Sequence, residues 1–178
     1  MRLFRQVLER FGADVPDESL YTGLLEASLQ GSSDCGGTVA FNMTAGEPVI
    51  RLERGVPLVY HSPETAFRLE DFMRSQLYAC FAALRLGMEK LDGEHVARDR
   101  FTGHGGLFRT PGVVQRYLAA ALHTPVETLP SADAGGAYGM ALFGLTCASA
   151  RRGRRWPLIW TRLCLRAGRD GWYGPRRP

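Results

Sequence analysis

Lysine is almost absent from this 178-residue chain, which has a single lysine, Lys90, and 21 arginines. Its four cysteines form no C-x-x-C pair, which argues against both a zinc site and a disulfide framework: Cys35, Cys80, Cys147 and Cys164. No apolar run approaches the roughly 20 residues that cross a membrane, and the N-terminus mixes charged with apolar residues, unlike a signal peptide. These absences favour the reducing cytoplasm and exclude a membrane-spanning protein.

Acidic residues are nearly missing from residues 151–178, which hold nine arginines and all three tryptophans but only one acid, Asp170. The 13 basic and 17 acidic residues that precede them give a net charge of −4, so the overall +4 combines −4 with +8. We interpret residues 1–145 as a domain and 146–178 as a disordered or non-native tail, for instance the product of a shifted reading frame. Such a tail could also bind nucleic acid or an anionic membrane, but the acidic body argues against these partners.

The hydrophobic pattern predicts three helices in the first half of the chain. The first is amphipathic and ends at Gly12, where glycine can adopt the left-handed C-cap conformation. The second covers residues 18–30, with Asp17 as its N-cap and Gly31 at its end. The third is long, because apolar residues recur at spacings of three and four over residues 69–91.

Several short segments have strand character and are bounded by turn residues. They cover residues 37–42, 48–52, 57–60, 96–102 and 125–129. The first three predict an antiparallel meander. The last two alternate with helices, one beginning with Thr110 as N-cap and Pro111 in its first turn, the other covering residues 134–145. This alternation predicts parallel pairing through right-handed crossovers, and the order βββαβαβα is that of a ribonuclease-H-like or actin-like α/β lobe.

Two clusters of small residues follow predicted strands. Residues 103–106 (GHGG) precede one helix and residues 134–141 open another. Glycines at the carboxyl ends of parallel strands let a phosphate approach the backbone, although a tight turn or close packing explains each cluster equally well. His104 has no His, Cys or carboxylate near it in sequence, so we expect its side chain to be solvated or hydrogen-bonded and not catalytic. We expect both clusters to lie at the same edge of the sheet.

Four separated motifs agree in order and spacing with a known family. They are residues 72–74 (FMR), 103–112 (GHGGLFRTPG), 125–126 (PV) and 135–142 (GGAYGMAL), and residues 36–42 (GGTVAFN) agree as well. From about Leu3 to Phe143 the chain resembles the C-terminal lobe of FGGY-family carbohydrate kinases, in particular the xylulokinase-like branch. The resemblance implies a partial actin-like (ribonuclease-H-like) ATPase lobe with a mixed sheet and flanking helices.

The implied activity is transfer of the γ-phosphate of ATP, with Mg²⁺, to a sugar such as the ketopentoses xylulose or ribulose. The resemblance implies nucleotide contacts at Gly105, Gly106 and Thr110, and it places the general-base aspartate and the sugar-binding residues in segments N-terminal to this sequence. Asp34 and Asp133, the local carboxylates, are expected to be turn or cap residues. The family usually has a glutamate where Ala134 stands.

We therefore expect no catalytic residue, no metal ligand and no kinase activity in the isolated chain. Its expected partner is a separately encoded N-terminal kinase lobe or a second copy of the chain. The alternative is a non-catalytic interaction module or a gene fragment with an arginine-rich tail.

Overall fold

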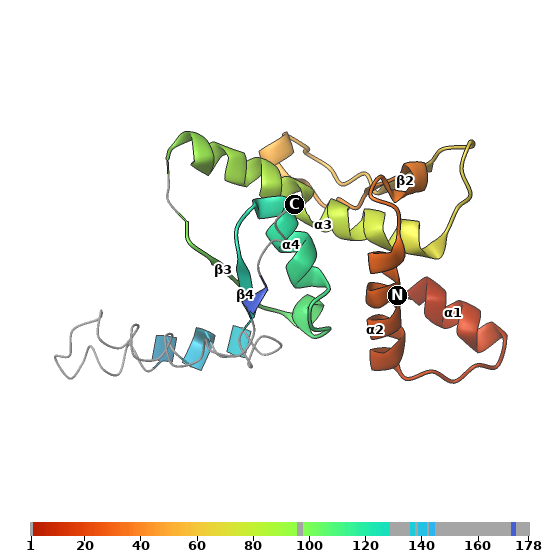
Figure 1. Cartoon of the computed structure of the whole chain (residues 1–178). Helices are drawn as coiled ribbons and strands as arrows, with labels where there is room; N and C mark the ends of the chain where they lie inside the picture. Colours follow the sequence, from red (N-terminus) through yellow and green to blue (C-terminus); the bar gives the residue numbers. More distant parts are fainter. Residues whose placement is uncertain are drawn as a thin grey trace. The chain divides into compact units, whose positions relative to one another are not determined.

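The structure is a computed structural model that describes residues 2–95 and 98–128, together with 136–137, 139–141, 143–144 and 172–173 (Figure 1). Helices and small sheets make up an α/β chain. It divides into two compact units, Met1–Gly87 and Met88–Pro178. A two-stranded sheet lies in the first unit and a three-stranded sheet in the second.

Helices α1 (Arg2–Arg10) and α2 (Asp17–Ala27) open the first unit, and the 3₁₀ turn η1 (Ser28–Gln30) continues α2. Gly12 has a φ of +68°, so the predicted glycine stop of the first helix is confirmed. The predicted N-cap is wrong, because Pro16 holds that position in an extended conformation. Asp17 instead lies in the first turn, where its carboxylate pairs with Arg5 of α1.

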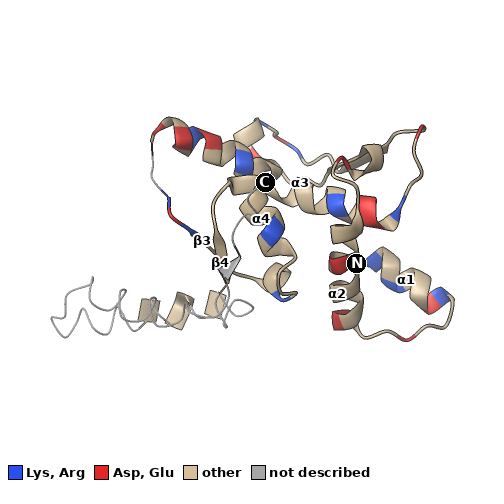
Figure 2. Ribbon diagram, viewed as in Figure 1, with Lys and Arg blue, Asp and Glu red and all other residues tan. Residues whose placement is uncertain are grey.

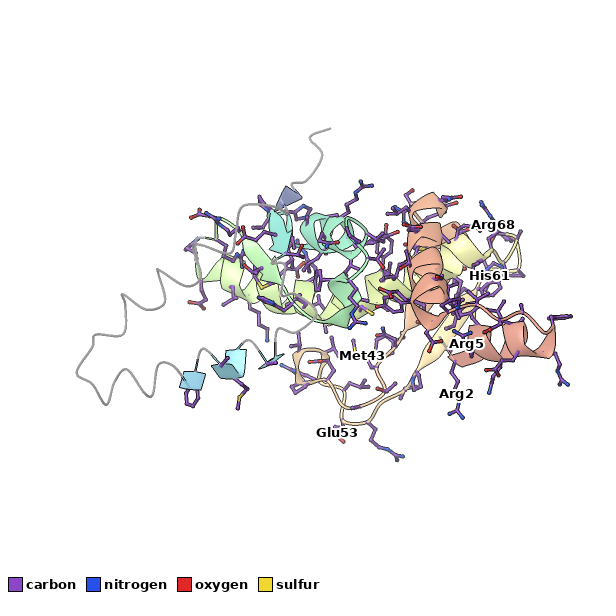
Figure 3. The ribbon with its side chains drawn as sticks, turned by 90° about the horizontal axis from the view of Figure 1, so that it is seen from below. Arg2, Arg5, Met43, Glu53, His61 and Arg68 are labelled. Carbon is purple, nitrogen blue, oxygen red and sulfur yellow. The ribbon has the colours of Figure 1, made fainter. Side chains whose placement is uncertain are left out.

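Strands β1 (Thr38–Phe41) and β2 (Leu58–His61) pair as an antiparallel hairpin. The expected middle strand of the meander is wrong, because its residues form the 3₁₀ turn η3 (Pro48–Ile50). The Glu47 carboxylate accepts a hydrogen bond from the Val49 N–H at 3.1 Å, and this local cap competes with strand pairing. Met43 and Glu53 mark the connection between the two strands (Figure 3).

Helix α3 (Leu69–Gly93) confirms the long helix predicted from the apolar spacing. Glu70 and Asp71 lie in its first turn and Lys90 in its last, as the helix dipole favours. Only part of the predicted apolar stripe is buried. Met73, Leu77 and Met88 are buried, whereas Leu69, Leu84 and Leu91 are more than 40% exposed.

The carboxylate of Asp71 holds the loop that precedes β1. Its side chain is 2% exposed, and its Oδ1 accepts a hydrogen bond from the Ser32 N–H at 2.6 Å. A Cβ atom on Gly36 would lie 2.8 Å from Asp71 Oδ2, so glycine is needed for this close approach. Burial raises the pKa of the nearby Cys35 thiol, an effect that the Arg74 guanidinium partly offsets.

The sheet of the second unit has the strand order β3–β4–β5. Strands β3 (Phe101–Gly103) and β4 (Val126–Thr128) are parallel, as predicted, and are connected through α4 (Val114–Leu122). Strand β5 (Trp172–Tyr173), which falls within the arginine-rich segment, pairs with β4 in the antiparallel direction. The sheet is therefore mixed.

Helix α4 begins later than the sequence predicts. Its N-cap is Val113, so the expectation that Thr110 caps it and Pro111 opens it is wrong. Gly112 has a φ of +78° and breaks the helical conformation between Pro111 and Val114. In the predicted last helix, the described residues 136–137, 139–141 and 143–144 are helical. The described residues include no helix that is long and apolar enough to cross a membrane.

Candidate nucleotide-binding site

The turn that follows β3 is built around a close contact of glycine with an aromatic ring. A Cβ atom on Gly103 would lie 2.5 Å from Cε1 of Phe108 and 2.7 Å from its Cζ. The ring therefore occupies the space beside the end of β3, and a larger residue at position 103 would displace it. Because β3 and β4 are parallel, this turn lies at the carboxyl end of the pair, where α/β sheets bind ligands.

Gly105 has backbone angles of φ +107° and ψ 167°, which residues with a side chain rarely adopt. It precedes the 3₁₀ turn η4 (Gly106–Phe108), in which the Phe108 N–H donates to the Gly105 carbonyl at 3.0 Å. A Cβ atom on Gly105 or Gly106 would meet no atom of the described residues within 4 Å. The backbone of these two glycines is thus open to an approaching ligand.

The donor groups of this turn suit an anion. Arg109 is the one charged residue within positions 103–110, and Arg116 is the one charged residue of α4 (Figure 2). The first N–H groups of a helical turn have no partner within the turn and can face phosphate oxygens. The same residues offer no carboxylate, so they fit a phosphate and do not fit Mg²⁺. The described ranges contain no group of three or more His, Cys, Asp or Glu placed to hold a metal ion.

The other residues singled out in the sequence take different positions. Thr110 is only 2% exposed, so its side chain is enclosed by the protein, and His104 is exposed. Asp34 accepts a hydrogen bond from the Gly36 N–H at 3.1 Å, which confirms it as a cap residue. Asp133 lies outside the described residues. Whether the cluster at 134–141 lies beside the first glycine turn stays a prediction.

The sequence analysis did not identify Gln115 as a buried polar residue. Gln115, the second residue of α4, is 1% exposed, and its Oε1 has no hydrogen-bond partner among the described residues. Buried amide oxygens are normally paired, because leaving one unpaired costs about 1–3 kcal/mol. A polar residue between Val114 and Tyr117 on an otherwise apolar face was the signal that could have identified it.

Solved structures that share this fold include xylulose kinases and a glycerol kinase. Xylulose kinase from Rhodospirillum rubrum aligns with a TM-score of 0.52 and 22% identity, over 67% of this chain and 24% of that one. Xylulose kinase from Bifidobacterium adolescentis has the same TM-score at 13% identity, over 72% and 24%. Glycerol kinase from Plasmodium falciparum, solved with ADP, gives a TM-score of 0.61 and 16% identity, over 97% and 32%.

Residues 3–148 match the profile of the C-terminal domain of the FGGY family of carbohydrate kinases. The chain belongs to this family, and its fold is part of the actin-like ATPase fold. It spans about a quarter to a third of the length of the solved kinases described above. Comparison with curated protein sequences gives no significant match.

Proposed function

We propose that this chain supplies the nucleotide-binding part of a carbohydrate kinase, which transfers the γ-phosphate of ATP to a sugar. The observation that carries the proposal is the open glycine turn at Gly105 and Gly106, at the carboxyl end of two parallel strands. Membership of the FGGY family supports the reaction class. Two of the structural relatives are xylulose kinases, which supports a ketopentose such as xylulose or ribulose as the acceptor.

Each nucleotide contact has a distinct role in this proposal. Gly105 and Gly106 let the phosphates approach the main chain, whose N–H groups neutralise part of the charge. Thr110 is enclosed, so its role is to fix the path of the turn or to contact the nucleotide after the turn opens. When bound, Mg²⁺ would neutralise phosphate charge, but no described residue of the turn is suited to hold it.

The isolated chain should bind nucleotide without transferring phosphate. Phosphoryl transfer needs a base that accepts the hydroxyl proton and groups that position the sugar. The described turn contains no carboxylate that could act as this base. We propose that an N-terminal kinase lobe supplies these groups and that the assembled enzyme works in the cytoplasm.

Binding of a fluorescent ADP analogue tests the proposed site directly. Gly106→Val should weaken binding by about tenfold or more, because the side chain occupies the open approach to the backbone. The φ of Gly106 is not left-handed and its Cβ position is open, so the Gly106→Val variant should fold. Gly87→Val is the control, because Gly87 is equally open but lies in α3. Equal affinity of both variants and the wild type would contradict the proposal.

A coupled ADP-release assay with xylulose and ribulose tests the proposal that the isolated chain does not transfer phosphate. We expect no turnover above a heat-treated sample from the chain alone. Turnover well above that blank would refute the requirement for a further lobe.

A further inference from the structure

Strand β4 lies between β3 and β5 in the sheet of the second unit (Figure 1). The Phe101 N–H donates to the Pro125 carbonyl at 2.9 Å, and Phe101 is opposite Val126 in the parallel register. Main-chain groups of successive residues in a strand face alternate sides, so the N–H and C=O of Val126 face away from β3. They therefore face β5.

Tyr173 of β5 is the residue directly opposite Val126 in the antiparallel register. Because the main-chain groups of Val126 point towards β5, these two residues form the pair that exchanges both of its N–H···O=C bonds. Val126 is 0% exposed. A buried N–H that has no partner costs about 1–3 kcal/mol, so β5 provides main-chain partners that β4 needs on this side.

The charge that β4 itself carries is engaged with residues of β3 and next to it. Glu127 is the charged residue of β4. Its carboxylate accepts a hydrogen bond from Thr102 Oγ1 at 3.2 Å and lies 3.4 Å from Arg100 Nη1. Charged side chains on an edge strand discourage pairing with other chains. With its carboxylate held by these two residues, Glu127 gives little protection to the side of β4 that faces β5.

The sequence of β5 and its surroundings has the features of a protected edge. The strand is two residues long. In the sequence it follows Gly171 and is followed by Gly174 and Pro175, with arginines close by on both sides. Short length, a nearby proline and flanking charge are devices by which edge strands avoid pairing with other chains. A sheet that ends at β5 is therefore better protected than one that ends at β4.

We propose that β5, which the arginine-rich segment supplies, is a native strand that closes the β4 edge and prevents it from pairing with another chain. This inference does not depend on nucleotide binding. Its alternative is the disordered or non-native segment that the sequence suggests for residues 146–178. The two differ at one main-chain group, because the Val126 N–H is protected from solvent exchange in the first case and exchanges freely in the second.

The test is hydrogen–deuterium exchange of single amides, measured by NMR on the full chain. We expect the Val126 N–H to be protected in the wild type and to exchange about tenfold faster or more in Tyr173→Pro, because proline has no N–H to donate to the Val126 carbonyl. The Glu127 N–H faces β3 and should keep its protection. Trp172→Pro is the matched control, since the N–H of Trp172 points away from β4 and its loss should leave Val126 protected.

Free exchange of the Val126 N–H in the wild type would overturn the proposal in favour of a disordered segment. Unchanged protection in Tyr173→Pro would also overturn it, as would equal losses in Tyr173→Pro and Trp172→Pro. An equal loss at Glu127 and Val126 in Tyr173→Pro would refute β5 as a separate closing strand. Light scattering tests the protective role. Tyr173→Pro should associate more than the wild type as the protein concentration rises, and an unchanged mean mass would refute that role.

Discussion

Replacing Asp71 tests how the loop before β1 is held. Its carboxylate is buried, lies in the first turn of α3 and accepts a hydrogen bond from the Ser32 N–H at 2.6 Å. A hydrogen bond to a charged group contributes about 1.5–3 kcal/mol, and a carboxylate at a helix N-terminus about 0.3–1 kcal/mol. Ser32 is exposed and can bond to water after the change, so we expect Asp71→Ala to cost about 2 kcal/mol.

The assay is urea unfolding, accompanied by a thermal melt in which the midpoint should fall by roughly 4–8 °C. Glu70→Ala is the matched control, because Glu70 occupies the same turn and, within the part of the chain that the structure describes, its carboxylate pairs with Arg68 alone, at 3.5 Å. It should cost about 0.3–1 kcal/mol. Asp71→Asn keeps an acceptor for the Ser32 N–H and should fall between the two. Equal losses for Asp71→Ala and Glu70→Ala would refute an anchoring role for Asp71.

Two further predictions concern the same unit. Gly23→Ala should raise the free energy of unfolding by about 0.5–1 kcal/mol, because Gly23 lies within α2 and its Cβ position is open. Gly36→Ala should lower the free energy of unfolding, because the φ of Gly36 is +55° and Asp71 occupies the space that the new methyl group needs. Urea unfolding of both variants checks this, and stabilisation by Gly36→Ala would contradict the geometry. The pKa of the Cys35 thiol is raised by burial, so its contribution to stability is present below the unfolded value, near pH ~8.5, and is lost as the pH rises through the folded value. Between about pH 8 and 10, Cys35→Ser should therefore lose less stability than the wild type. Cys80→Ser is the control for removal of a thiol. Equal losses of stability in Cys35→Ser and the wild type would refute the effect of burial.

The sequence predicts the elements whose signals are local and repeated. The apolar spacing of α3 extends over many turns, and Gly12 ends α1 through its own backbone freedom. The hairpin was predicted with one strand too many, because a single side-chain cap from Glu47 turns residues 48–50 into a 3₁₀ turn. A short apolar run looks the same in either conformation, so periodicity could not distinguish them.

The candidate site was predicted less completely than the fold. The glycines at 105 and 106 stand out in the sequence because few other residues allow the backbone to be approached closely. Thr110 precedes α4 and Gln115 lies within it, and both residues are buried. The burial of a single polar residue depends on tertiary packing, which the apolar spacing of one segment does not describe.

In the proposed function, nucleotide binding and phosphate transfer require different groups. The turn at Gly105 leaves room for a ligand beside its main chain, and the proposed phosphate binding requires this room. Transfer also needs a carboxylate close to the acceptor hydroxyl, and the described turn holds none.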